Sequence, residues 1–396
     1  MNQLLILTAY SFHFVRYGVL FPLVPLVAES MGAGAAVIGI TVGAFSLIAI
    51  FLSIPLGGLT DRFGVKRLLL LGVVCNIVSA LVLLAADTIA ALFLVQTIAG
   101  VGFLLHVVAS QAYFSRLPRA VDRERGFGFI SFAAAVGQGL GPLLGGFLAD
   151  RYGYPAAFAA VLAFSVVGLV VLGVKDSAEV RAVKSTFSLS RDLQSVWKLL
   201  QSGRVRIVLL FAFVVIFAVS LRNSFLPVFL INRGLGEAGV GFLIALFAGA
   251  STSIRLFFGF LLNRLSRRAV TALAVGAVAL GVGTIPLMPS PGGYAAALVV
   301  FGLGFGLSQP LSMVMMSDLA EAQVGGLAMG LRFTAIMAAN LSSPVMLGLM
   351  AEAVGLPFVF FAAAALVAMF GVATVVLRPN LLPQRREEHS APQPLR

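Results

Sequence analysis

Four arginines lie inside long apolar runs of the sequence, at Arg16, Arg222, Arg255 and Arg332. In a bilayer, a charged side chain at mid-depth costs about 2.5 to 3.5 kcal/mol on insertion scales, so such a residue is by default a candidate for function. No carboxylate lies well inside the same runs, so a site built on these cations would attract anions and repel lipophilic cations. The alternative is that the arginines reach an interface or bond to helix carbonyls, and we favour it for Arg255 and Arg332.

Protonatable groups in or near the runs suggest a second chemistry, the carriage of a proton. His106 lies in the fourth apolar run, and a histidine titrates near neutrality, although it could equally be a neutral packing residue. Glu29 and Asp318, at the ends of two runs, are the acids that come closest to a span. We take His106, Glu29 and Asp318 as the proton-coupling candidates.

The composition shows that the chain as a whole is unusually apolar. Of its 396 residues, 60% are apolar and 11% are charged, and the mean hydropathy is +1.05, whereas soluble chains carry roughly 25% charged residues. The protein is therefore predicted to be an integral membrane protein. Three histidines and one cysteine give no metal cluster or disulfide framework, and the chain has no phosphate-binding loop. We expect no cofactor, no metal, no nucleic-acid partner and no enzymatic activity.

Runs of about 18 to 25 apolar residues are long enough to cross a bilayer as helices. The first six predicted spans are 4–27, 36–58, 68–86, 90–114, 126–148 and 155–174. The second six are 206–231, 239–262, 269–288, 293–317, 325–350 and 356–377. The predicted fold class is an all-α membrane protein of twelve transmembrane helices.

The distribution of basic residues predicts the orientation. The segments after spans 2, 4, 6 and 8 and the C-terminal tail hold 21 of the 27 lysines and arginines, whereas the opposite loops hold only Arg151 and Arg233. Because short basic loops resist translocation, we expect both termini to be cytoplasmic, in the cell membrane. The net charge of +12 then reflects topology.

The second half of the chain repeats the first at a constant offset of 202 residues. Matching pairs include Pro25 with Pro227, Gly32 with Gly234, Gly39 with Gly241, Gly100 with Gly302, Phe103 with Phe305, Pro142 with Pro344, Gly146 with Gly348 and Gly153 with Gly355. With an even number of spans each, the halves are predicted to form two six-helix bundles related by an axis along the bilayer normal, with a shared site between them.

The repeat sets the expected domain boundaries. Residues 1–174 form the N-terminal bundle, 175–205 a cytoplasmic linker, 206–378 the C-terminal bundle and 379–396 a polar tail. In the linker, an apolar stripe at helical spacing predicts an amphipathic helix on the cytoplasmic leaflet. It comprises Leu189, Leu193, Val196, Trp197 and Leu200.

Two segments carry recognisable glycine patterns. Residues 57–67 read GGLTDRFGVKR, and residues 137–146 read GQGLGPLLGG. The first resembles the cytoplasmic loop signature of the major facilitator superfamily, and the second is similar to an element of its exporter branches. The loop residues concerned are Gly57, Asp61, Arg62, Gly64, Lys66 and Arg67; those of the fifth span are Gly137, Gly141, Pro142, Gly145 and Gly146.

The resemblance implies a twelve-span secondary transporter that works by alternating access. It implies that Asp61 contacts the start of span 11 and that spans 1 and 7 line a central cavity. The residues we then assign to the cavity are Arg16, Arg222, His13, Tyr17, Asn223 and Gln309. One departure concerns proton coupling, because Gln96 stands where the export signature has an arginine.

We therefore expect efflux of a small organic solute, with proton antiport as a candidate coupling, by a monomer in contact with membrane lipid. One alternative is a uniporter or symporter for organic anions, organised around Arg16 and Arg222. Another is a membrane sensor that kept the fold and lost transport.

Overall fold

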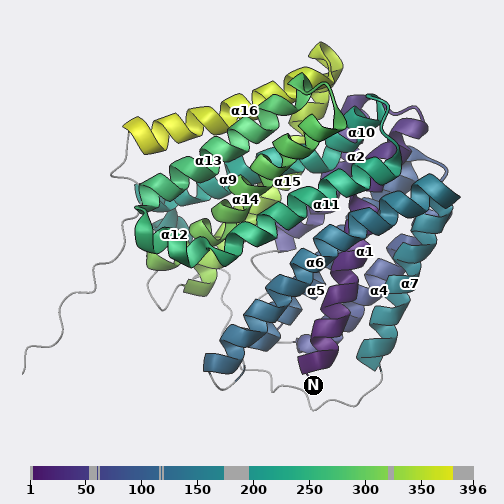
Figure 1. Ribbon diagram of the computed structural model, residues 1–396. Helices are drawn as coiled ribbons and strands as arrows, with labels where there is room; N and C mark the ends of the chain where they lie inside the picture. Colours follow the sequence, from purple (N-terminus) through teal and green to yellow (C-terminus); the bar gives the residue numbers. More distant parts are fainter. Residues whose placement is uncertain are drawn as a thin grey trace, which may run out of the picture.

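A computed structural model describes residues 3–52, 60, 63–115, 117, 120–173, 196–319 and 325–377. Within these ranges the chain is helical and contains no strand (Figure 1). Twelve of its helices are long and apolar enough to cross a membrane. The predicted fold class is confirmed.

Six helices form the N-terminal bundle and the rest form the C-terminal bundle. The first set comprises α1 (Gln3–Ser30), α2 (Ala35–Leu52), α4 (Val65–Leu84), α5 (Ile89–Ser115), α6 (Ala120–Tyr152) and α7 (Tyr154–Gly173). The second set comprises α9 (Gly203–Ser224), α10 (Leu226–Ile231), α11 (Glu237–Leu256), α12 (Phe258–Arg264), α13 (Arg267–Thr284), η1 (Ile285–Leu287), α14 (Pro291–Leu319), α15 (Gly325–Val354), α16 (Leu356–Gly371) and the π-helix η2 (Val372–Leu377).

The offset of 202 residues reappears in the backbone turns. Gly32 and Gly234 have φ of 82° and 85°, and Gly153 and Gly355 have φ of 81° and 94°. This left-handed region favours glycine, which explains why glycine occupies these positions in both halves. Each pair ends equivalent helices at equivalent turns.

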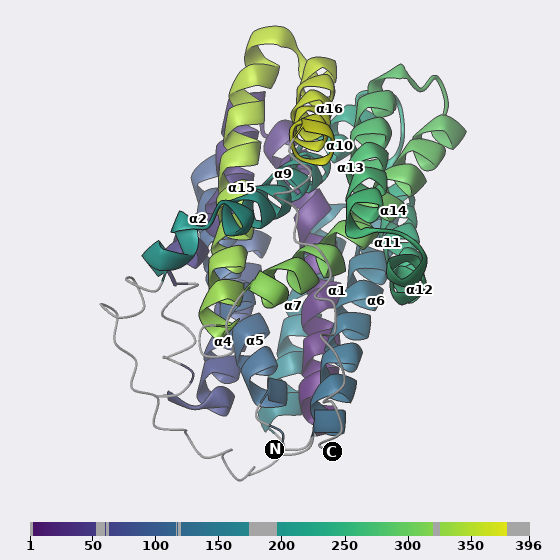
Figure 2. The ribbon, with the colours of Figure 1, turned by 90° about the vertical axis from the view of Figure 1, so that its left-hand side faces the viewer.

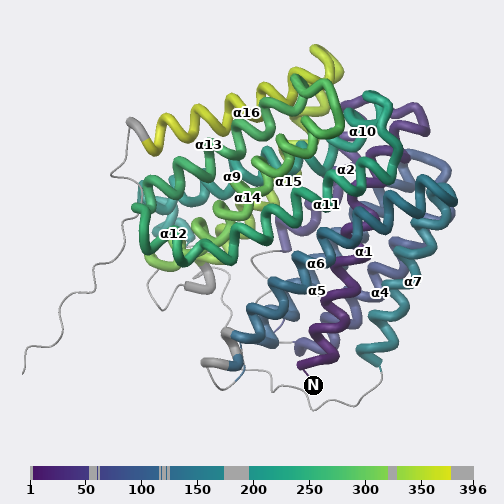
Figure 3. The backbone as a smooth tube through the Cα atoms, viewed as in Figure 1, coloured from purple at the N-terminus to yellow at the C-terminus, as the bar shows by residue number. Residues whose placement is uncertain are grey.

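The helix packing repeats in the same way. A Cβ on Gly100 would collide with the backbone of Phe45, and a Cβ on Gly302 would collide with that of Phe247. The ring of Phe45 lies 5.4 Å from that of Phe103, and the ring of Phe247 lies 5.6 Å from that of Phe305. The two halves are structural copies, as the repeat predicted (Figure 3).

The bundles meet at one end, which we call the joined end. It is the end where α1 finishes at Ser30 and α2 begins at Ala35, away from the N-terminus. Here α2 packs against α15, and α6 packs against α11. From the joined end the helices of the two bundles run in diverging directions (Figures 1 and 2).

Two predicted features, the linker helix and the loop signature, lie only partly within the described residues. In the linker, residues 196–201 are helical, Val196 is buried and Trp197 is 67% exposed, whereas Leu189 and Leu193 are not described. The helix α9 begins at Gly203, within the range predicted for the linker. Of the loop signature, Gly57, Asp61 and Arg62 lie outside the described residues.

Candidate functional site

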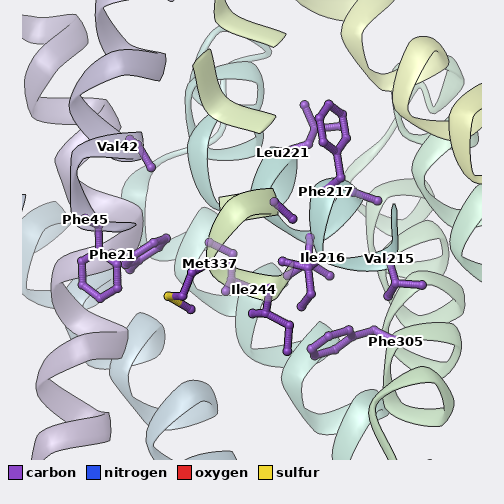
Figure 4. Packing of buried hydrophobic residues seen from close by; sticks show 14 of the residues in the cluster. Phe21, Val42, Phe45, Val215, Ile216, Phe217, Leu221, Ile244, Phe305 and Met337 are labelled. Atoms are coloured by element: carbon purple, nitrogen blue, oxygen red, sulfur yellow. The ribbon is translucent and has the colours of Figure 1, made fainter. Parts of the chain in front are cut away.

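Tyr17 places a phenol between the two bundles, at mid-length of α1. Its ring lies 4.7 Å from the ring of Phe21, 4.9 Å from that of Phe103 and 5.6 Å from that of Phe45. Four aromatic rings from α1, α2 and α5 thus form one surface of the N-terminal bundle. Figure 4 shows Phe21 and Phe45 on one side and Met337, Ile244 and Phe305 of the C-terminal bundle on the other.

Arg222 lies on the opposite bundle, close to an interruption in the seventh span. The helix α9 ends at Ser224, and α10 begins at Leu226 with a proline in its first turn. The Nε and Nη2 atoms of Arg222 donate hydrogen bonds of 3.0 and 2.5 Å to Oδ1 of Asn223. The guanidinium carbon lies 4.2 Å from the centre of the Phe247 ring, in a cation–π arrangement. Discontinuous helices of this kind mark binding sites in known transporters.

Tyr17 and Arg222 lie near each other across the boundary between the bundles, where α1 contacts α9. Both side chains are only partly buried. The structure therefore brings together three of the residues assigned to the cavity, namely Tyr17, Arg222 and Asn223. We take this group, with the Phe247 ring, as the candidate site.

Arg16 and His13 point elsewhere, into the interior of the N-terminal bundle. Arg16 is 1% exposed, and its Nη2 lies 3.5 Å from the hydroxyl of Ser79 on α4. Its Nε and Nη1 atoms have no hydrogen-bond partner among the described residues. The side-chain amide of Asn76, on α4, lies 3.1 Å from Nδ1 of His13.

His106 completes this buried polar cluster. Its ring stacks on that of His13 with a centroid distance of 4.4 Å and an interplanar angle of 8°. Neither ring nitrogen of His106 has a hydrogen-bond partner among the described residues, and the side chain is fully buried. Arg16 reaches Ser79, one helical turn from the Asn76 that contacts His13, so Arg16 and the two histidines share one buried cluster.

Gln309 is engaged within the C-terminal bundle. Its Oε1 accepts a hydrogen bond of 2.9 Å from Nη2 of Arg332, whose Nε also donates to the hydroxyl of Ser312 at 3.0 Å. Arg332 is buried and tied to α14 by these bonds. The structure thus accounts for Arg332 as a side chain held by neutral polar partners.

A row of four side chains, in the order cation, ring, ring, cation, joins α9, α11 and α14. Arg222 covers Phe247, the Phe247 ring stacks near Phe305, and the guanidinium of Arg255 lies 5.9 Å from the Phe305 ring. Arg255 also donates to the hydroxyl of Ser251 at 3.3 Å. Sequence reasoning did not assign Phe247 or Phe305 to the site, although their pairing with Phe45 and Phe103 at the repeat offset was a usable signal.

The two acidic proton-coupling candidates lie at opposite ends of the bundles. Oε1 of Glu29, at the joined end, accepts a hydrogen bond of 3.0 Å from Asn232. Asp318, near the end of α14, forms an ion pair of 2.5 Å with Arg267. Among the described residues, every acid of the twelve spans lies close to a helix end.

The glycine pattern of α6 serves two contacts. Gly137, Gly141 and Gly145 pack against the backbone of α1, with Gly141 facing Gly18. Pro142 and Gly146 instead face the other bundle. A Cβ on Gly241 would collide with the carbonyl of Pro142, and a Cβ on Gly146 would collide with the backbone at Glu237.

The repeat produces a second copy of this contact between the bundles. A Cβ on Gly39 would collide with the carbonyl of Pro344, and a Cβ on Gly348 would lie 2.6 Å from the carbonyl of Ala35. Gly39 and Pro344 are the counterparts of Gly241 and Pro142. The joined end is therefore fastened at two equivalent points, one between α2 and α15 and the other between α6 and α11.

The remaining loop-signature residues lie at the start of α4. Gly64 has φ of 83° and directly precedes the helix, so its turn requires glycine. Lys66 and Arg67 occupy the first turn of α4. The predicted contact of Asp61 lies outside the described residues.

Comparisons with known proteins agree with this architecture. A family model described as Major Facilitator Superfamily matches residues 6–339. The chain is 24% identical over 359 residues to Multidrug resistance protein 2 of Bacillus subtilis (strain 168), covering 88% of each protein. The solved nucleoside transporter NupG has a TM-score of 0.76 at 16% identity, covering 94% of this chain and 98% of that one. A D-xylose-proton symporter gives 0.77 at 17% identity, covering 96% and 97%.

Proposed function

Because the chain belongs to the Major Facilitator Superfamily, we propose that this membrane transporter exports small organic solutes by alternating access. The observation that carries the proposal is the paired fastening of the bundles at the joined end, combined with their divergence from it (Figure 1). Two rigid bundles held at one end give access from the other end. Breaking these contacts while forming new ones at the opposite end would reverse the access.

The distribution of basic residues along the chain indicates which side of the membrane this state opens toward. If the termini are cytoplasmic, the joined end faces outward and the described state opens toward the cytoplasm. Export then begins with loading from the cytoplasm at Tyr17 and Arg222. The glycine pattern of α6 and the similarity to a protein named for multidrug resistance support the outward direction.

Proton antiport is the coupling that we propose to test. The described spans hold no acid at mid-depth, so coupling through a buried carboxylate that competes with a cationic substrate is not favoured here. His106, Glu29 and Asp318 remain the candidates. Glu29 and Asp318 lie near opposite ends of the bundles, where a proton could enter or leave.

Flux into proteoliposomes tests the proposal directly. Purified protein is reconstituted, a pH difference is imposed, and uptake of a panel of neutral, anionic and cationic aromatic solutes is followed. We expect uptake of at least one solute that depends on the protein and is driven by the gradient. Uptake that is equal with and without the pH difference would remove proton antiport but leave export in place. No flux of any solute would contradict the transport proposal.

A further inference from the structure

We propose that the candidate site selects organic anions that carry an aromatic ring, with the acidic group held by Arg222 and Tyr17. This inference names the substrate class of the exporter proposed above and therefore rests on it. It follows from the charge at the site, from the hydrogen-bond donors it presents and from the rings around it.

The charge at the site is a guanidinium with a neutral partner. Two nitrogens of Arg222 donate hydrogen bonds to Oδ1 of Asn223. An amide oxygen is uncharged, so it orients the guanidinium without neutralising its charge. No salt bridge of Arg222 is present among the described residues, and Arg255 adds a second cation along the same row. An arriving anion would supply the missing negative charge.

The donors at the site match an acidic group. The third nitrogen of Arg222, Nη1, and the hydroxyl of Tyr17 make no hydrogen bond to any described residue. Both are donors, and a carboxylate or sulfonate presents only acceptors. An oxyanion between them would bond to α1 and to α9 at once, so it would tie the two bundles together at mid-depth.

The aromatic rings define the rest of the substrate. The rings of Tyr17 and Phe103 lie 4.9 Å apart and are both partly exposed, whereas the rings of Phe21, Phe45 and Phe247 are buried. A planar ring attached to the acidic group could stack on the exposed part of Tyr17 and Phe103 in offset or edge-to-face geometry. A small hydrophilic anion would leave this aromatic surface uncovered.

A matched pair of solutes tests the inference. A naphthalenesulfonate and a naphthylmethyl-trimethylammonium share one ring system and carry permanent, opposite charges, so neither crosses the bilayer as a neutral species. Protein-dependent flux of both is measured in the same proteoliposomes. Binding of both to the purified protein is measured by the fluorescence of the naphthalene ring. We expect the sulfonate to be bound and moved at least about ten-fold better, the scale of one charged hydrogen bond.

Variants locate the preference at Arg222. Arg222→Gln, which keeps a donor and loses the charge, should reduce sulfonate binding and flux about ten-fold. Arg222→Lys should restore most of the loss, because it restores the charge. The matched control is Arg233→Gln, which removes an exposed cation that covers Phe229 at the joined end and should leave both readouts unchanged.

The outcomes separate this inference from the exporter proposal. Preferential binding or flux of the ammonium compound, or sulfonate binding that survives Arg222→Gln in a protein of unchanged melting temperature, would overturn the anion selectivity and leave export standing. Sulfonate binding that is lost in Arg222→Gln, together with no flux of any solute, would support the anion site and contradict export.

Discussion

Glu352 of α15 accepts a hydrogen bond of 3.0 Å from the backbone amide of Ala36, in the first turn of α2. The repeat counterpart joins Asp150 of α6 to Gly236, which precedes α11; a Cβ on Gly236 would lie 2.6 Å from the Asp150 carboxylate. Each acid thus sits at the positive end of a helix from the other bundle, a favourable charge–dipole arrangement. Both contacts belong to the joined end.

Removing these acids should weaken the joined end. Both contacts have a charge–dipole term of about 0.3 to 1 kcal/mol, and the Glu352 contact adds a hydrogen bond of about 1 kcal/mol. Glu352→Ala should therefore lower the ratio of closed to open joined ends at least about five-fold, and Asp150→Ala should lower it by a smaller factor. A reporter at Met337→Cys, in a Cys75→Ala background, would show this as increased labelling from the side of the joined end by an impermeant maleimide. Met337 points toward Phe21 and Phe45 in Figure 4.

Asp87→Ala, in the turn between α4 and α5, is the control for this experiment because it removes an exposed acid of the N-terminal bundle, which also holds Asp150. Its labelling should equal that of the parent. If the Glu352 and Asp150 variants label like Asp87→Ala, the two acids contribute nothing to closure.

Gly241→Ala should impair transport without affecting an isolated bundle. The added methyl would collide with the carbonyl of Pro142 across the boundary, and overpacking of this kind costs about 1 to 3 kcal/mol. We expect flux to fall about ten-fold, because the joined end can no longer close fully. Gly249→Ala on the same helix meets nothing within 4 Å and should transport at the parental rate. Equal rates in the two variants would show that this contact does not limit transport.

Gly141→Ala should instead lower the stability of the N-terminal bundle. Gly141 faces Gly18 within that bundle, where close helix approach depends on small residues. A loss of about 1 to 3 kcal/mol should appear as a lower melting temperature in detergent. The control is Gly128→Ala on the same helix, where a Cβ meets nothing within 4 Å. A melting temperature matching this control would contradict the packing assigned to Gly141.

Arg16→Met tests whether the buried arginine serves structure or substrate. Two of its nitrogens lack partners, and replacing an uncompensated buried charge by an apolar side chain of similar length should be neutral or stabilising by about 1 to 3 kcal/mol. We expect an unchanged or higher melting temperature and solute flux within a few-fold of the parent. A stable protein that has lost its flux would instead assign Arg16 to the substrate.

The sequence predicted the fold well because two independent patterns carried it. Long apolar runs set the number of spans, and identities at a fixed offset showed that the halves are copies. Gly32 and Gly234, or Gly153 and Gly355, repeat because their turns require a left-handed backbone. These constraints are local, so they can be read from the chain.

The direction in which a side chain points was harder to predict from the sequence than the fold. Arg16 and Tyr17 are neighbours in sequence, but successive residues of a helix point about 100° apart. Tyr17 therefore faces the other bundle while Arg16 enters its own. The acids of the joined end escape prediction for a different reason: Asp150 and Glu352 are chemically alike but not identical, so no identity at the repeat offset marks them.

The two equivalent fastenings, Gly39 with Pro344 and Gly241 with Pro142, have a geometric consequence. While both contacts hold, the bundles can tilt about the line that joins the two points but cannot twist around the pseudo-twofold axis. A single contact would permit that twist. The second copy of the contact therefore limits the relative motion of the halves in this state to one direction of tilt.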